Sequence, residues 1–238
     1  MASNDQAADA SPAERPATWR ELAVARSLDP ARVRAEKRVQ RFLDAALELM
    51  ATSSSKEFTV QEVVERSGQS LRSFYQYFAG KHELLLALFE ESVRSTAEHL
   101  EQLIEAEDDP LERLRRFTVE YFRLCQPAPK GKPASKDGPT PALAEFAQQL
   151  LTDHPKEASR AYVPLVSLLE RVLEQAAAAG VVRSGLRYRR IAGVVLQAIS
   201  FNAFSATISG SSVKPDDQES AAELWDLLLH GIATGERG

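Results

Sequence analysis

Residues suited to covalent cross-linking or metal binding are scarce in this 238-residue sequence. It has one cysteine, Cys125, so no internal disulfide can form and no cysteine cluster can hold zinc. Charges interrupt its apolar stretches, and none approaches the roughly 18 apolar residues that a membrane span needs. Residues 1–14 are polar and lack the apolar core of a secretory signal. We therefore expect a cytoplasmic protein without a membrane segment, metal site or cofactor.

The sequence also lacks recognisable catalytic motifs. It has no H-E-x-x-H pattern, no cysteine–histidine cluster, no glycine-rich phosphate loop and no nucleophile elbow. The four histidines are scattered along the chain, at His82, His99, His154 and His230. Structural roles are the better interpretation of these residues and of Cys125, so we expect no enzyme. A small helical enzyme remains the least favoured alternative.

The net charge of −5 does not favour a protein that coats nucleic acid with its whole surface. The charge is uneven, however, because residues 20–41 carry seven cations and three anions, a net charge of +4. This basic run either contacts DNA or forms a solvated helix face, and the sequence does not separate these two interpretations. We favour DNA contact, along the backbone or in a minor groove, for Arg32, Arg34 and Arg38.

Helical spacing of apolar residues predicts an all-α protein with about nine helices. The expected helices cover residues 32–52, 59–67, 70–80, a long segment that begins at 81, 110–125, 141–151, 155–180 (irregular near Pro164), 186–208 and 217–234. Residues 1–18 are predicted to be disordered, and the proline-rich stretch 126–141 to be a mobile loop.

Residues 58–85 predict two short helices joined by a tight turn, the helix-turn-helix arrangement. Thr59 and Glu62 form a capping box, Gly68 ends the first helix, and Ser70 caps the second. Phe74 and Phe78 lie four residues apart and should face the core. The opposite face has hydrogen-bond donors and one cation, with no carboxylate between Glu65 and Glu83. Such a face suits a polyanion.

This segment resembles the DNA-binding domain of the TetR family of transcriptional regulators. The resemblance covers about 50 residues and departs from the usual pattern at Val64, Ser67 and Gln69. The positions that match are Thr59, Val63, Gly68, Ser70, Ser73, Phe74, Tyr75, Tyr77, Phe78, Lys81 and Leu84.

The resemblance implies a DNA-contacting set within the helix-turn-helix. Residues expected to hold phosphates are Thr59, Ser73, Tyr75, Tyr77 and Lys81, and Ser70 is also expected to contact DNA. Residues expected to face base edges are Gln61, Leu71, Arg72 and Gln76, with Arg72 suited to guanine and Leu71 to a thymine methyl group. Two alternatives stay open: Leu71 could pack against Phe74, and Lys81 could be a solvated helix start.

The resemblance divides the chain into a DNA-binding domain over residues 19–80, with a basic N-terminal arm, and an effector-binding and dimerisation domain over 81–238. It implies a pocket for a largely apolar small molecule, although an aromatic stripe at helical spacing is more often plain core. The candidate lining residues are Phe117, Tyr121, Phe122, Cys125, Phe146, Leu150, Tyr162, Leu165, Leu169 and Phe201. The loop 126–141 would be either a lid or an inert insertion.

The last two predicted helices have wide apolar faces rich in small residues. The resemblance implies that they form a homodimer interface, which would give a palindromic operator. Burial of these faces within one monomer is the alternative. The expected function is that of a ligand-responsive, sequence-specific regulator that binds duplex DNA as a repressor. A helical protein–protein adaptor without DNA binding is the main rival.

Overall fold

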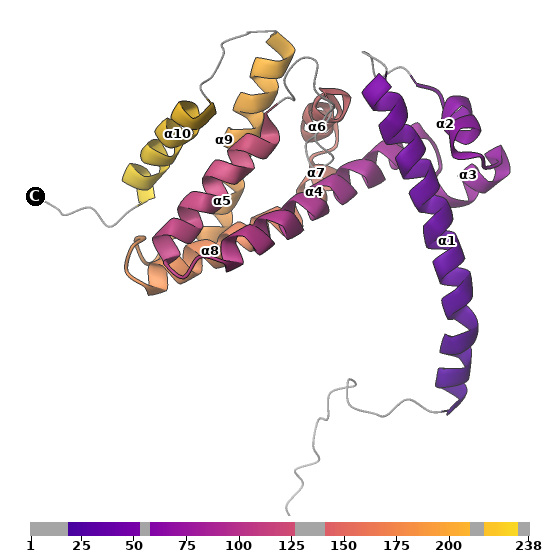
Figure 1. Ribbon diagram of the computed structural model, residues 1–238, viewed down its shortest axis with the longest axis horizontal. Helices are drawn as coiled ribbons and strands as arrows, with labels where there is room; N and C mark the ends of the chain where they lie inside the picture. Colours follow the sequence, from indigo (N-terminus) through magenta and orange to yellow (C-terminus); the bar gives the residue numbers. More distant parts are fainter. Residues whose placement is uncertain (1–18, 53–57, 127–140, 210–216, 233–238) are drawn as a thin grey trace, which may run out of the picture. The chain divides into compact units, whose positions relative to one another are not determined.

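The computed structural model describes residues 19–52, 58–126, 141–209 and 217–232 (Figure 1). Its contacts divide the chain into two compact units, with the boundary between Arg41 and Phe42 inside the first helix. The described residues form ten α-helices, so the all-α prediction is confirmed. The predicted disordered tail, and residues 127–140 of the predicted loop, lie outside the described residues.

The first helix, α1 (Trp19–Thr52), begins at Trp19 and not at Arg32 as predicted. Residues 19–31 are rich in Ala, Leu, Arg and Glu, which favour helix, and Pro30 lies inside α1 without ending it. The basic run is therefore helical and is not an extended arm. Arg32, Arg34 and Arg38 are exposed on it, and Arg32 pairs with Glu36 at 3.7 Å.

The predicted caps of the helix-turn-helix are present in α2 (Val60–Ser67) and α3 (Leu71–Tyr77). Thr59 Oγ1 accepts the Glu62 amide at 3.2 Å, and the Glu62 carboxylate accepts the Thr59 amide at 2.6 Å. Gly68 ends α2 with a φ of 64°, a left-handed conformation that glycine adopts without strain. The Ser70 hydroxyl then accepts the Ser73 amide at 3.1 Å.

The third helix ends earlier than expected. Phe78 is already extended, and Gly80 is the N-cap residue of α4 (Lys81–Glu105) rather than the end of α3. The Glu83 carboxylate accepts the Ala79 amide at 2.6 Å, so the residues before Lys81 are used to begin α4.

Three phenylalanines form the core beneath α3. Phe74 is fully buried, and its ring lies edge-on to Phe42, with centroids 5.4 Å apart. Phe78 contacts the same Phe42 ring at 6.2 Å. Because both rings point to the interior, the opposite side of α3 is left facing solvent.

The remaining helices are α5 (Pro110–Cys125), α6 (Pro141–Asp153), α7 (Pro155–Ala161), α8 (Val163–Ala178), α9 (Tyr188–Ser209) and α10 (Asp217–Ile232). Helix α5 packs against α4, α8, α9 and α10, and α8 packs along α9 (Figure 1). None of the helices in the described ranges is long and apolar enough to cross a membrane.

The predicted helix over 155–180 is two helices, which raises the number from nine to ten. Tyr162 both ends α7 and begins α8, and Pro164 lies in the first turn of α8. Proline has no amide hydrogen and its ring collides with the carbonyl of a preceding turn, so one continuous helix is interrupted here.

Candidate nucleic-acid interface and effector region

The outer face of α3 is the candidate DNA-reading surface. Ser70, Leu71, Arg72, Tyr75 and Gln76 are all exposed. The Leu71 side chain is 42% exposed, so it does not belong to the core beside Phe74. The three predicted base-reading residues of α3, Leu71, Arg72 and Gln76, are thus all exposed to solvent.

The electrostatics of this face favour a polyanion. Helix α3 contains no acidic residue, and in the described chain Arg72 has no ion-pair partner. The nearest carboxylates in sequence on the C-terminal side belong to Glu83, which accepts the Ala79 amide. On the N-terminal side the nearest is Glu65, which accepts a hydrogen bond from Gln61, and further away hydrogen bonds from Thr59 lower the pKa of Glu62 below its ordinary value of 4.5. A phosphate would therefore meet a free guanidinium and helix N-terminal amides.

Four of the other predicted contacts already have partners or are partly covered. Lys81 Nζ donates to the Phe58 carbonyl at 2.6 Å and lies 4.3 Å from the Phe58 ring centroid. Gln61 Nε2 donates to Glu65 at 3.2 Å. Ser73 and Tyr77 are half-buried. DNA contact by these residues stays a prediction, and for Gln61 it requires the Glu65 bond to break.

Ser73 has a further peculiarity. Its Oγ is the one buried side-chain polar atom without a hydrogen-bond partner among the described residues. A buried hydroxyl without a partner is unfavourable by about 1–3 kcal/mol. Ser73 therefore gains from any movement that brings its hydroxyl to an acceptor such as a phosphate oxygen.

The predicted effector-lining residues form mostly packed core. Nine of the ten are buried, among them Phe117 (fully) and Leu150, whereas Phe201 is 63% exposed on α9 and does not join them. The alternative of an ordinary core describes eight of these nine residues, and the ninth, Tyr162, lines a cavity. Ligand contact by them stays a prediction.

A cavity of about 330 Å³ lies instead between α6, α7, α8 and α9. Tyr162 is the one predicted residue that lines it. The full lining comprises Leu151, Pro155, Ser159, Tyr162, Val163, Val166, Arg189, Gly193, Leu196 and Gln197. Most of these side chains are apolar, and Arg189 provides one cation, which also pairs with Glu170 at 2.9 Å. Such a lining suits a mainly apolar molecule with an anionic group.

A small polar cluster lies in the core beside this cavity. It consists of Tyr121, Cys125, Tyr162 and Ser200, which are all buried and interact with one another electrostatically. The Ser200 hydroxyl also donates to the Leu196 carbonyl at 2.8 Å. Burial raises the pKa of both tyrosines above the ordinary value and that of Cys125 to about 12. All three groups are neutral at pH 7, and the thiol is a poor nucleophile.

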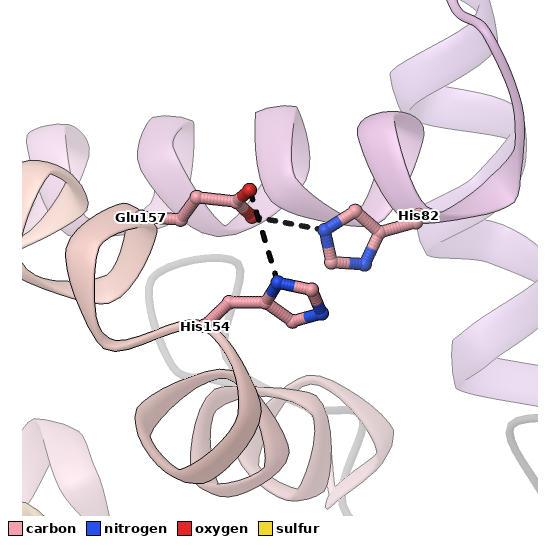
Figure 2. Close-up of side chains that lie close together, drawn as sticks. All are labelled: His82, His154 and Glu157. Carbon is pink, nitrogen blue, oxygen red and sulfur yellow. Dashed lines mark hydrogen bonds and ion pairs between the residues drawn. The ribbon is translucent and has the colours of Figure 1, made fainter.

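The fold also brings together two of the histidines that looked scattered (Figure 2). His82, in the first turn of α4, lies beside His154 and Glu157 at the start of α7. His82 Nε2 is 2.9 Å from the Glu157 carboxylate. Sequence analysis missed this cluster because 75 positions separate His82 from Glu157; the i, i+3 spacing of His154 and Glu157 was its only local sign.

Comparison with known proteins assigns the N-terminal part of the chain. Residues 42–88, which include α2 and α3, match the model of "Bacterial regulatory proteins, tetR family". The chain is also similar to the "Fatty acid metabolism regulator protein" of Bacillus subtilis (strain 168), with 27% identity over 82 residues. That alignment covers 34% of this chain and 42% of the relative, less than half of its length.

Solved structures share the fold over most of the chain. FadR from Bacillus subtilis, a transcriptional regulator in complex with stearoyl-CoA, aligns with a TM-score of 0.58 at 18% identity and covers 81% of this chain and 98% of its own. A TetR-family regulator from Pectobacterium atrosepticum aligns with a TM-score of 0.63 at 16% identity, covering 87% and 99%.

The family match confirms the resemblance found in the sequence over residues 42–88, and it favours a DNA-binding regulator over an enzyme. The matched residues contain the capped helices, the three-phenylalanine core and the outward α3 face described above. Residues 42–88 of the chain therefore carry the DNA-binding region found in the tetR family of bacterial regulatory proteins.

Proposed function

We propose that the protein is a homodimeric repressor that binds a palindromic operator and is released by a largely apolar effector. The observation that carries this proposal is the outward face of α3, which has a free arginine and no acid. In a helix-turn-helix the second helix enters the major groove, where an arginine can bind guanine through two hydrogen bonds.

An exposed apolar stripe on α9 supports the homodimer. Val194 (60% exposed), Ala198 and Phe201 (63%) follow one another at i, i+4 and i+7. Leu227 on α10 is 72% exposed. Contiguous apolar surface of this kind marks an interaction site, and a two-fold axis would bury it on both copies at once.

The cavity between α6 and α9 supports a fatty-acyl effector. Its apolar walls suit an acyl chain, and Arg189 keeps donors beyond its Glu170 bond for an anionic group. One relative is a fatty acid metabolism regulator, and one solved relative holds stearoyl-CoA. Long-chain acyl-CoA is therefore the first effector class to test.

Operator binding is tested by selecting duplexes from a random pool and measuring affinity at two salt concentrations. We expect an inverted repeat, and an affinity that falls steeply with salt because phosphate contacts release counterions. An enriched site without two-fold symmetry, or no retarded band at micromolar protein, would contradict the proposal.

Effector binding is tested with acyl-CoA thioesters of increasing chain length in the same assay. Wild-type protein should leave the operator as the chain lengthens. Gly193→Leu should bind DNA normally but resist release, because an added Cβ meets no atom within 4 Å and the longer side chain fills the cavity. Equal release of both proteins would place the effector elsewhere.

A further inference from the structure

Three metal-binding side chains meet on the surface between α4 and α7. The candidate ligand atoms of His82, His154 and Glu157 all lie within 4.8 Å of one another (Figure 2). The His82 and His154 ring centroids are 4.7 Å apart, and each ring has a nitrogen within 4.0 Å of the Glu157 carboxylate. Two imidazoles so close to each other and to one carboxylate can share a single cation.

The distances are close to those of a zinc site. Donors about 2.0–2.1 Å from a tetrahedral zinc ion lie about 3.4 Å from one another. The two measured separations bracket this value: His82 Nε2 to Glu157 Oε2 is 2.9 Å, and His154 Nδ1 to Glu157 Oε1 is 3.9 Å. The widest separation in the set is within 4.8 Å, so side-chain rotations that shorten it by up to about 1.4 Å would accommodate an ion.

The backbone beneath the ligands is well fixed. His154 joins α6 to α7: its amide donates to the Leu150 carbonyl at 2.9 Å, and its carbonyl accepts the amides of Glu157 and Ala158. The buried Phe146 ring packs against His82, 5.8 Å between centroids, and also against Phe89. Ligands held on packed elements need little reorganisation to bind.

We propose that His82, His154 and Glu157 form a binding site for one divalent transition metal ion of the zinc class. Two imidazoles and one carboxylate suit zinc, cobalt and nickel, whereas magnesium and calcium prefer oxygen ligands. All three side chains are partly exposed, so the ion can enter from solvent and keep water in its remaining positions.

The bound ion would connect the first turn of α4 to α7. Helix α4 begins shortly after α3, and its first residue, Lys81, is bonded to the Phe58 carbonyl in front of α2. The site therefore lies where the helix-turn-helix ends and the effector region begins, and metal binding should stabilise that junction against unfolding.

The test uses full-length protein without a histidine tag and without DNA, so its outcome is independent of operator binding. Zn²⁺ is titrated calorimetrically, Co²⁺ is followed by its visible absorption, and Mg²⁺ serves as a negative control. We expect one Zn²⁺ per chain and a rise in melting temperature. His82→Ala and Glu157→Gln should each weaken Zn²⁺ binding at least about 10-fold, the lower end of losses for changes outside the ligand set.

His99→Ala, on the same helix but outside the cluster, is the matched control and should bind like wild type. Glu157→Gln keeps the side-chain size, and circular dichroism verifies that each variant is folded. Absence of Zn²⁺ binding, or equal binding by wild type, His82→Ala and Glu157→Gln, would overturn the proposal and leave the cluster as a surface ion pair.

Discussion

The helix-turn-helix and the effector region use aromatic residues in opposite ways. In α3, Phe74 is fully buried while its neighbour Tyr75 is 57% exposed, so one of two adjacent rings belongs to the core and the other to the surface. In the effector region, nine of ten predicted lining residues are buried, and of these Tyr162 alone lines the cavity, whose other walls are formed by different side chains. Helical spacing thus identifies the inward face of a short helix, but it does not distinguish a packed interior from a pocket wall.

The largest effect should come from the pair Phe74 and Tyr75. Phe74→Ala should lower the free energy of unfolding by about 3–5 kcal/mol, because it leaves a cavity beside Phe42. Tyr75→Ala should lower it by about 1 kcal/mol, mainly through loss of the edge-on contact with Phe74. Chemical denaturation measures both. Equal losses of unfolding free energy in the two variants would contradict the assignment of Phe74 to the core and Tyr75 to the surface.

The next effect is on sequence recognition. Arg72→Ala should lose about 1–3 kcal/mol of discrimination between operator and scrambled duplex. Lys81→Ala should weaken both duplexes alike and also destabilise the fold, because it removes the bond to the Phe58 carbonyl. Arg66→Ala is the control: Arg66 lies on α2, and the change breaks its exposed pair with Glu48 of α1. Gel-shift titrations measure the affinity of each variant for both duplexes. Similar losses of discrimination in Arg72→Ala and Arg66→Ala would contradict base reading by Arg72.

The helix-turn-helix could be predicted in detail because its signals are local. Thr59 and Glu62, Gly68, and Ser70 specify the ends of their helices through partners at most a few positions away. The error at the end of α3 arose where a glycine, usually a stop signal, serves to begin the next helix. Exposure of Leu71 and Arg72 followed from the inward direction of Phe74 and Phe78.

The effector region could be predicted only in outline because its sites are assembled from distant residues. The cavity joins Leu151 to Gly193, and the histidine cluster joins α4 to α7. No periodicity links such positions in the sequence. Two helix bounds were also wrong: α1 begins before Pro30 and continues through it, and the helix expected over 155–180, irregular near Pro164, is two helices that meet at Tyr162.

A smaller effect concerns the cap of α2. Thr59→Ala should lower the free energy of unfolding by about 1 kcal/mol, the usual contribution of an N-cap side chain. Glu62 has a folded-state pKa below its ordinary value, so its contribution is present above pH 4.5 and is lost as the pH falls through the folded value. Denaturation of wild type and Glu62→Gln between pH 7 and 3 should therefore converge at low pH. A difference that stays constant would contradict this role.

The smallest effect should be a gain. Gly193 lies inside α9, and an added Cβ would meet no atom within 4 Å. Gly193→Ala should therefore raise the free energy of unfolding by about 0.5–1 kcal/mol through helix propensity. Thermal denaturation shows whether the melting temperature of Gly193→Ala is above or below that of the wild type. A loss of stability would mean that the wall of the cavity is packed and not open.

The single thiol of the chain has a practical consequence. Because Cys125 is buried and stays protonated at neutral pH, it resists alkylating reagents in the folded protein. A cysteine introduced at the exposed Gln76 would then be the sole group that a maleimide dye can reach. Fluorescence from such a label would follow the recognition helix directly as it meets DNA, in a chain altered at one position.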